Sequence, residues 1–90
     1  ILTPAPGQLT FPVMQRLCGH GLSVSDDEVR RAMALAFATL KIVLEPGGAV
    51  ALAAALFRGA ALAPGPVIVT ASGGNVDAAA YAEILATNSP

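Results

Sequence analysis

Charged residues are scarce in this sequence. Asp, Glu, Lys and Arg together make up 12% of the 90 residues, whereas hydrophobic residues make up 54%. Typical globular domains contain roughly 25% charged residues. A small domain has a large surface for its volume and needs more charge than average to stay soluble. We therefore expect much of this surface to be covered, either by the remainder of a longer polypeptide or by a companion subunit.

Long hydrophobic runs are also missing. The longest mostly apolar stretches, residues 32–40 and 49–57, are shorter than the roughly 20 residues that cross a bilayer. The N-terminus begins at Ile1, without Met and without the basic and apolar regions of a signal peptide. The sequence thus predicts a fragment of a larger chain and no membrane partner.

The sequence has no cluster of basic residues and only one cysteine. Five scattered basic residues and a net charge of −1 predict no nucleic-acid partner. The lone Cys18 excludes an internal disulfide and favours a reducing, cytoplasmic location. Because Cys18 and His20 have no further Cys or His beside them, no metal site is predicted.

Four elements are predicted behind a loop-rich lead-in: helices at 25–44, 46–58 and 77–85, and a strand at 66–71. Ser25 and Glu28 match a capping box, in which each side chain accepts a hydrogen bond from the other residue's backbone N–H. Asp77 is the predicted cap of the last helix. Within the lead-in, residues 1–24, Pro12 is suited to the first turn of a short helix.

The predicted strand sets the fold class. Residues 67–70 read VIVT, a β-branched run with little alternation, which is typical of a strand buried on both faces of a parallel sheet. A single strand cannot satisfy its own backbone hydrogen bonds. The sheet must therefore come mostly from elsewhere, and the order helix, helix, strand, helix predicts one part of an α/β domain.

The turn that follows the strand is the first candidate site. Ser72, Gly73, Gly74 and Asn75 lie between a buried strand and a helix, the usual ligand position in open α/β sheets. Glycines allow close backbone approach, and the next helix offers free N–H groups. The same four residues also suit an ordinary strand-to-helix turn, so the residues alone leave both interpretations open.

A second candidate lies at residues 45–49, which read EPGGA. Glu45 precedes a helix that starts with two glycines, Gly47 and Gly48. The carboxylate is either a charge placed near a cofactor or a complement to the helix dipole, with the glycines allowing tight packing. Taken alone, the residues favour the second interpretation.

Together, the two motifs give the sequence a resemblance to known proteins. EPGGA at 45–49, followed by SGGNVD at 72–77, resembles the end of fold-type II pyridoxal-phosphate enzymes, which are tryptophan synthase beta-like. Within them it is similar to the threonine dehydratase, serine racemase and hydroxyaspartate ammonia-lyase group. TPAPGQLTFP at 3–12 and VSDDEV at 24–29 resemble the preceding stretches of that group, so the similarity extends over nearly the whole chain.

The resemblance implies a cofactor, pyridoxal 5'-phosphate, and a role for each motif. Ser72 would hydrogen-bond the pyridine nitrogen, Gly73, Gly74 and Asn75 would shape the pocket, and the segment with Glu45 and Gly47 would lie beside it. The implied reaction removes the α-proton and the β-hydroxyl of a hydroxy amino acid and releases ammonia with a 2-oxo acid. The amino-acid substrate and a homo-oligomeric assembly belong to the full-length enzyme.

Parts of the family pattern are absent from these residues. The sequence has no Schiff-base lysine motif and no glycine-rich phosphate loop. Its single lysine, Lys41, has the position of a solvated helix residue and is not assigned a catalytic role. We expect the 90-residue chain alone to be inactive. The competing hypothesis is a small non-enzymatic α/β module that binds an effector or a partner through its apolar surface.

Overall fold

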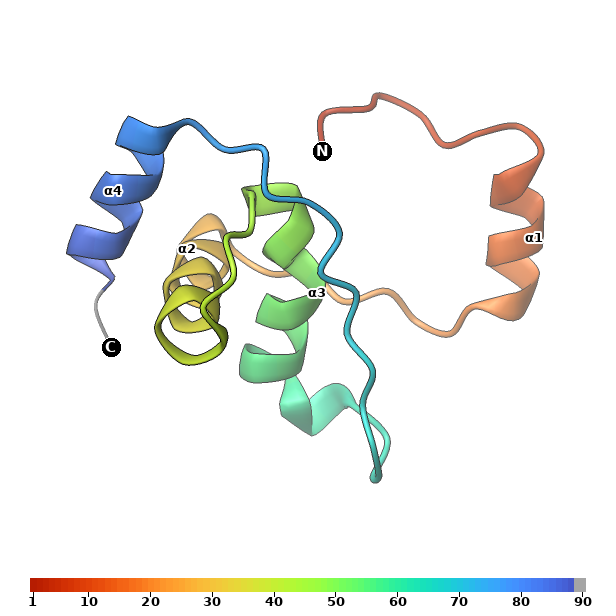
Figure 1. Ribbon diagram of the computed structural model, residues 1–90. Helices are drawn as coiled ribbons and strands as arrows, with labels where there is room; N and C mark the ends of the chain where they lie inside the picture. The colour runs from red at the N-terminus through yellow and green to blue at the C-terminus, as the bar shows by residue number, and fades with distance from the viewer. Residues whose placement is uncertain (89–90) are drawn as a thin grey trace.

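The computed structural model describes residues 1–88, which form helices joined by extended segments (Figure 1). In chain order the elements are α1 (Thr10–Leu17), α2 (Asp26–Leu35), the π-helical turn η1 (Ala36–Leu40), α3 (Pro46–Phe57), the 3₁₀ turn η2 (Gly59–Ala61) and α4 (Ala78–Thr87). Helices α2, α3 and α4 lie together, whereas α1 stands apart on the right of Figure 1. Residues 89 and 90, the end of the predicted domain 1–90, lie outside the described residues.

Helix α2 begins at the predicted capping box. The backbone N–H of Glu28 donates to the Ser25 hydroxyl at 3.2 Å, and the backbone N–H of Ser25 donates to a carboxylate oxygen of Glu28 at 2.8 Å. Both donors would otherwise be unpaired at the start of the helix. The capping prediction is confirmed.

The helix predicted over 25–44 ends earlier than expected. After α2 the chain widens into η1, and Lys41 then adopts a left-handed backbone conformation with φ of 60°. A residue in this conformation ends a helix, because the next N–H no longer points along the helix axis. The extended residues that follow place Leu44, only 3% exposed, in the core. The prediction was wrong at this end because the helical spacing of the apolar residues does not register the left-handed turn.

Small buried residues lie where α2 packs against α3. Ala32 on α2 and Ala49 and Ala53 on α3 are 0% exposed, and Ala36 of η1, 2% exposed, belongs to the same buried cluster. Side chains of this size let helix backbones approach closely. Met33 is the largest fully buried side chain and belongs to this cluster.

Helix α4 packs against α2, and its aromatic residue Tyr81 also contacts Phe37 of η1. The Asp77 carboxylate accepts the backbone N–H of Ala80 at 3.0 Å, which confirms the predicted cap. Tyr81, 8% exposed, meets the ring of Phe37 edge to face, with centroids 6.0 Å apart and planes at 83°. Aromatic pairs prefer this arrangement over a parallel sandwich.

The predicted strand at 66–71 is not formed. Residues 1–88 contain no strand, and residues 67–70 run extended but without a neighbouring strand. Val67 is 50% exposed and Ile68 97% exposed. A strand exists only when its backbone groups pair with another strand, and no such partner lies within this part of the chain. The described residues are therefore helical, and the sheet of the predicted α/β fold is not among them.

A large apolar surface is left open. Helix α1 has no buried residue, and Phe11, Met14 and Leu17 expose 45%, 56% and 71% of their surfaces. Exposed apolar surface on this scale is typical of faces that other protein covers. Among the described residues, no helix has both the length and the apolar character needed to cross a membrane.

Candidate functional site

The two sequence motifs meet at the start of α3. The backbone N–H of Glu45 donates to the carbonyl oxygen of Gly73 at 2.9 Å, which joins residues 28 positions apart. Figure 1 shows the extended segment before α4 passing over the N-terminal end of α3. The two motifs, which are separate stretches in the sequence, therefore form a single site in the structure.

Three glycines make this contact possible. A Cβ at Gly48 would lie 2.5 Å from the carbonyl oxygen and 2.9 Å from the nitrogen of Gly73, and a Cβ at Gly74 would lie 2.6 Å from the carbonyl oxygen of Val43. A Cβ at Gly73 would collide with the Glu45 carboxylate. Because real Cβ atoms do not approach backbone this closely, these glycines permit two backbone segments to pack directly on each other.

The predicted polar residues line the rim of this contact. Ser72 and Asn75 flank the glycine pair and expose their surfaces, while Glu45 is half-buried. Gly47 is exposed, and the nearest atom to its Cβ position is Ile1 Cγ1 at 3.6 Å, so it does not touch the turn. Gly48, which was not among the predicted cofactor residues, does. Its signal in the sequence was the glycine pair at the start of an alanine-rich helix.

The chemical content of the site is modest and polar. The Ser72 hydroxyl can donate or accept a hydrogen bond, the Asn75 amide can do both, and Glu45 supplies a carboxylate. Val76 N–H donates to the Gly74 carbonyl at 3.0 Å and tightens the turn just before Asp77 caps α4. This set suits a ring nitrogen or another neutral hydrogen-bonding group of a ligand.

Lys41 does not project a free amine from the helix end. Its ammonium group donates to the carbonyl oxygen of Ala38 at 2.7 Å, and the residue is exposed. A cation that hydrogen-bonds the last carbonyls of a helix complements the helix dipole. This is the behaviour expected of a solvated helix residue.

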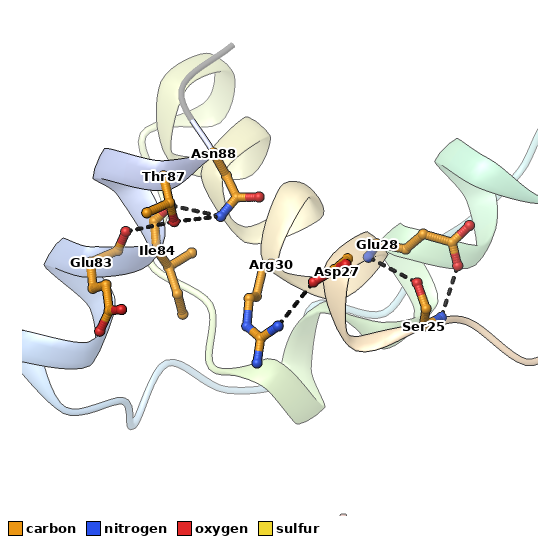
Figure 2. A network of polar contacts seen from close by, with 8 residues as sticks. All are labelled: Ser25, Asp27, Glu28, Arg30, Glu83, Ile84, Thr87 and Asn88. Atoms are coloured by element: carbon orange, nitrogen blue, oxygen red, sulfur yellow. Dashed lines mark hydrogen bonds and ion pairs between the residues drawn. The ribbon is translucent and has the colours of Figure 1, made fainter.

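A second polar region lies between α2 and α4 (Figure 2). An open groove there is lined by residues of both helices and the start of α3: Asp26, Asp27, Val29, Arg30, Arg31, Pro46, Ala80, Glu83, Ile84, Thr87 and Asn88. Arg30 pairs with Asp27 at 3.0 Å, and the Asn88 amide donates to the Ile84 carbonyl at 3.0 Å, which ends α4. The sequence patterns did not predict this groove. Neither Glu45 nor Gly73 lines it, although Pro46, the residue after Glu45, does.

Comparison with known proteins agrees with the motif assignment. The model of the family described as pyridoxal-phosphate dependent enzyme matches residues 1–73. The chain belongs to this family. Its cofactor is accordingly pyridoxal phosphate, and membership implies the fold-type II architecture that the resemblance predicted.

Several curated relatives match most of this chain but only a small part of their own length. A serine racemase from Dictyostelium discoideum is 38% identical over 82 residues, 88% of this chain and 25% of the relative. An L-threonine ammonia-lyase from Geobacter sulfurreducens is 34% identical over 77 residues, 86% of this chain and 19% of the relative. A phenylserine dehydratase from Ralstonia pickettii is 40% identical over 87 residues, 94% of this chain and 26% of the relative. The chain thus spans about a quarter or less of these relatives. No solved structure matches significantly.

The residues present fit part of a pyridoxal-phosphate site. The exposed Ser72 hydroxyl is a neutral partner for a pyridine nitrogen, and the glycine contacts fix the backbone on which it sits. The family's phosphate loop and Schiff-base lysine motif do not occur in the sequence. The residues present therefore fit one wall of such a site and not the whole of it.

Proposed function

We propose that this chain is part of a pyridoxal-phosphate dependent ammonia-lyase that converts a hydroxy amino acid to a 2-oxo acid and ammonia. The observation that supports it most is the hydrogen bond from the Glu45 N–H to the Gly73 carbonyl, because it brings the two family motifs into one site. The names of the relatives, ammonia-lyases and a dehydratase among them, support the reaction class.

Each predicted site residue has a role in this proposal. The Ser72 hydroxyl binds the pyridine nitrogen of the cofactor. Gly73, Gly74 and Asn75 form the adjoining wall, and the segment that contains Glu45 and Gly47 supports it from the start of α3. When bound, the cofactor supplies an electron sink for the bond broken at the α-carbon. A neutral hydroxyl at Ser72, unlike a carboxylate, leaves the ring nitrogen less protonated and so moderates that sink.

The rest of the active site lies outside these 90 residues. The remainder of the polypeptide or a companion subunit supplies the lysine, the phosphate site and the substrate-carboxylate site, and the 90 residues alone are inactive. The full-length enzyme is a homo-oligomer in the cytoplasm. The exposed thiol of Cys18 fits that reducing location.

Substitution of Ser72 in the full-length polypeptide tests the assignment. Ser72→Ala removes the hydrogen bond to the ring nitrogen, and Ser72→Asp places a carboxylate there. We expect both to change the absorption spectrum of the bound cofactor and to lower ammonia release from L-serine, L-threonine or L-threo-3-hydroxyaspartate by about tenfold or more, the scale of one lost polar contact. Ser23→Ala, an exposed serine outside the site, is the control. Unchanged spectra and rates in both Ser72 variants would contradict the role of Ser72.

A racemase is the second candidate, because the serine racemase of Dictyostelium discoideum is 38% identical to this chain. Chiral chromatography of the products from L-serine separates the two reactions, since a racemase yields D-serine and a lyase yields pyruvate and ammonia. A full-length protein that takes up no pyridoxal phosphate would instead favour the non-enzymatic binding module.

A further inference from the structure

Contacts with Gly73 explain the position of the Glu45 side chain, without any contact to the cofactor. Glu45 occupies the N-cap position of α3, yet its carboxylate makes no capping hydrogen bond. It lies over Gly73 instead, where a Cβ on the glycine would collide with the carboxylate oxygen and stand 3.2 Å from Cδ. The helix-dipole interpretation of this residue therefore does not account for where the carboxylate points.

Glu45 holds Gly73 with its backbone as well. Its N–H donates to the Gly73 carbonyl at 2.9 Å, so main chain and side chain of one residue contact the same glycine. Gly48 adds a further contact, because its own missing Cβ leaves room for the Gly73 backbone. Gly73 is thereby fixed by two residues of the α3 start, and Ser72 is the residue directly before it.

We infer that Glu45 is a positioning residue, which sets the place of the Ser72 hydroxyl through Gly73 and does not contact the cofactor itself. The part that concerns the cofactor rests on the proposed function. The packing part does not, because it depends only on contacts among described residues. Glu45 and Ser72, which the resemblance places in one cofactor-binding set, thus have different roles.

Compensating substitutions in the full-length polypeptide test this inference. Gly73→Ala introduces a methyl group into the space that the Glu45 carboxylate occupies. We expect it to weaken cofactor binding by about tenfold, which is the size of effect that substitutions at directly contacting residues have on each other. Glu45→Ala opens that space, so the double variant Glu45→Ala/Gly73→Ala should bind the cofactor nearly as well as Glu45→Ala alone. Glu45→Gln keeps the shape of the side chain and should keep the wild-type absorption maximum.

Two glycine substitutions are the controls. Gly48→Ala collides with the backbone of Gly73, which cannot move aside as a side chain can, so adding Glu45→Ala should not rescue it. Gly59→Ala meets no atom within 4 Å and should leave cofactor binding and stability unchanged. The two controls separate relief of one particular collision from a general effect of alanine at glycine positions.

A readout that needs no cofactor keeps the two proposals distinguishable. The backbone N–H of residue 45 is hydrogen-bonded to the carbonyl oxygen of Gly73. The hydrogen-exchange rate of this N–H in the apoprotein therefore reports whether the hydrogen bond is formed. Gly73→Ala should speed that exchange, and Glu45→Ala should reverse the effect. If the unchanged protein takes up no pyridoxal phosphate but the exchange effects are coupled, the proposed function fails and the packing role of Glu45 stands. Additive effects of the two substitutions on exchange would overturn the inference, and so would a Glu45→Gln spectrum that matches Glu45→Ala.

Discussion

The guanidinium group of Arg58 donates hydrogen bonds to both carboxylate oxygens of Glu28. Arg58 Nη2 donates to Glu28 Oε2 at 2.7 Å, Nη1 donates to Oε1, and Nε donates to the backbone carbonyl of Ser23 at 3.2 Å. The same carboxylate caps α2 through the N–H of Ser25. One side chain thus joins the start of α2 to the end of α3, in the two-pronged geometry that only arginine provides.

This pair predicts a pH dependence of stability. The pKa of Glu28 is lowered below its ordinary value, first by the backbone hydrogen bond from Ser25 and then by Arg58. A carboxyl group with a lowered folded-state pKa stabilises the fold above its unfolded value of about 4.5, and this contribution is lost as the pH falls through the folded pKa. Thermal unfolding of the full-length protein between pH 7 and pH 3 should show a smaller acid loss in Glu28→Gln than in wild type. Glu83→Gln removes an exposed carboxylate outside this pair and serves as the control; an equal change there would contradict the assignment.

Removal of the helix cap should weaken the fold by a moderate amount. Ser25→Ala deletes the acceptor of the Glu28 N–H and is expected to cost about 1 kcal/mol of unfolding free energy. Ser25→Asp keeps an acceptor at the cap and should recover most of this. Urea titration followed by circular dichroism measures both. A Ser25→Ala variant as stable as wild type would show that the capping box contributes nothing to the fold.

The centre of the core predicts the largest single loss. Met33 is fully buried among α2, α3 and α4, and Met33→Ala should lower the unfolding free energy by about 2–5 kcal/mol through lost burial and the cavity left behind. Met14, which is 56% exposed on α1, offers the matched control. The same change there should have an effect of less than about 0.5 kcal/mol. Equal costs at the two positions would mean that Met33 is not at the centre of the core.

The left-handed residue at the end of η1 predicts a change of opposite sign. Lys41 has φ of 60°, a conformation that costs an L-residue roughly 1–2 kcal/mol and costs glycine little. Lys41→Gly should therefore stabilise the protein by roughly 0.5 kcal/mol after the entropy of the unfolded glycine is subtracted. Thr39→Gly, inside the turn, should destabilise it by about 1 kcal/mol. Thermal unfolding of the two variants gives the signs; a loss at Lys41→Gly would contradict the left-handed assignment.

The buried hydroxyl of Tyr81 predicts how the stability of the protein changes at high pH. Tyr81 Oη is buried and has no hydrogen-bond partner among the described residues, and burial raises the pKa of this phenol above its ordinary value. The unfolded state then loses its proton first as the pH rises past about 10, so stability falls there. Tyr81→Phe should leave stability at pH 7 unchanged or slightly higher, because it removes an unpaired polar atom. Its unfolding temperature should also fall less above pH 10. A clear loss at pH 7 would reveal a partner for the hydroxyl.

Local sequence predicted the features that local chemistry controls. The cap at Ser25 and the cap at Asp77 depend on residues within three positions of each other, so the pattern alone locates them. The strand at 66–71 could not be judged in this way, since pairing with another strand decides whether a β-branched run is a strand at all. The end of the helix at Leu40 likewise depends on a backbone turn at Lys41 that the helical spacing does not show.

The two motifs, the helix starts and the likeness to pyridoxal-phosphate enzymes could be predicted from the sequence, because each of them depends on neighbouring residues. Three relationships required the folded chain: the contact of Glu45 with Gly73, the room that Gly48 but not Gly47 leaves for the turn, and the pairing of Arg58 with Glu28. These relationships link positions 25 to 30 residues apart, and their geometry follows from how α3 packs against its neighbours. Residue spacing along the chain carries no record of that packing, so the roles of Glu45 and Gly48 appear only once the helices are in place.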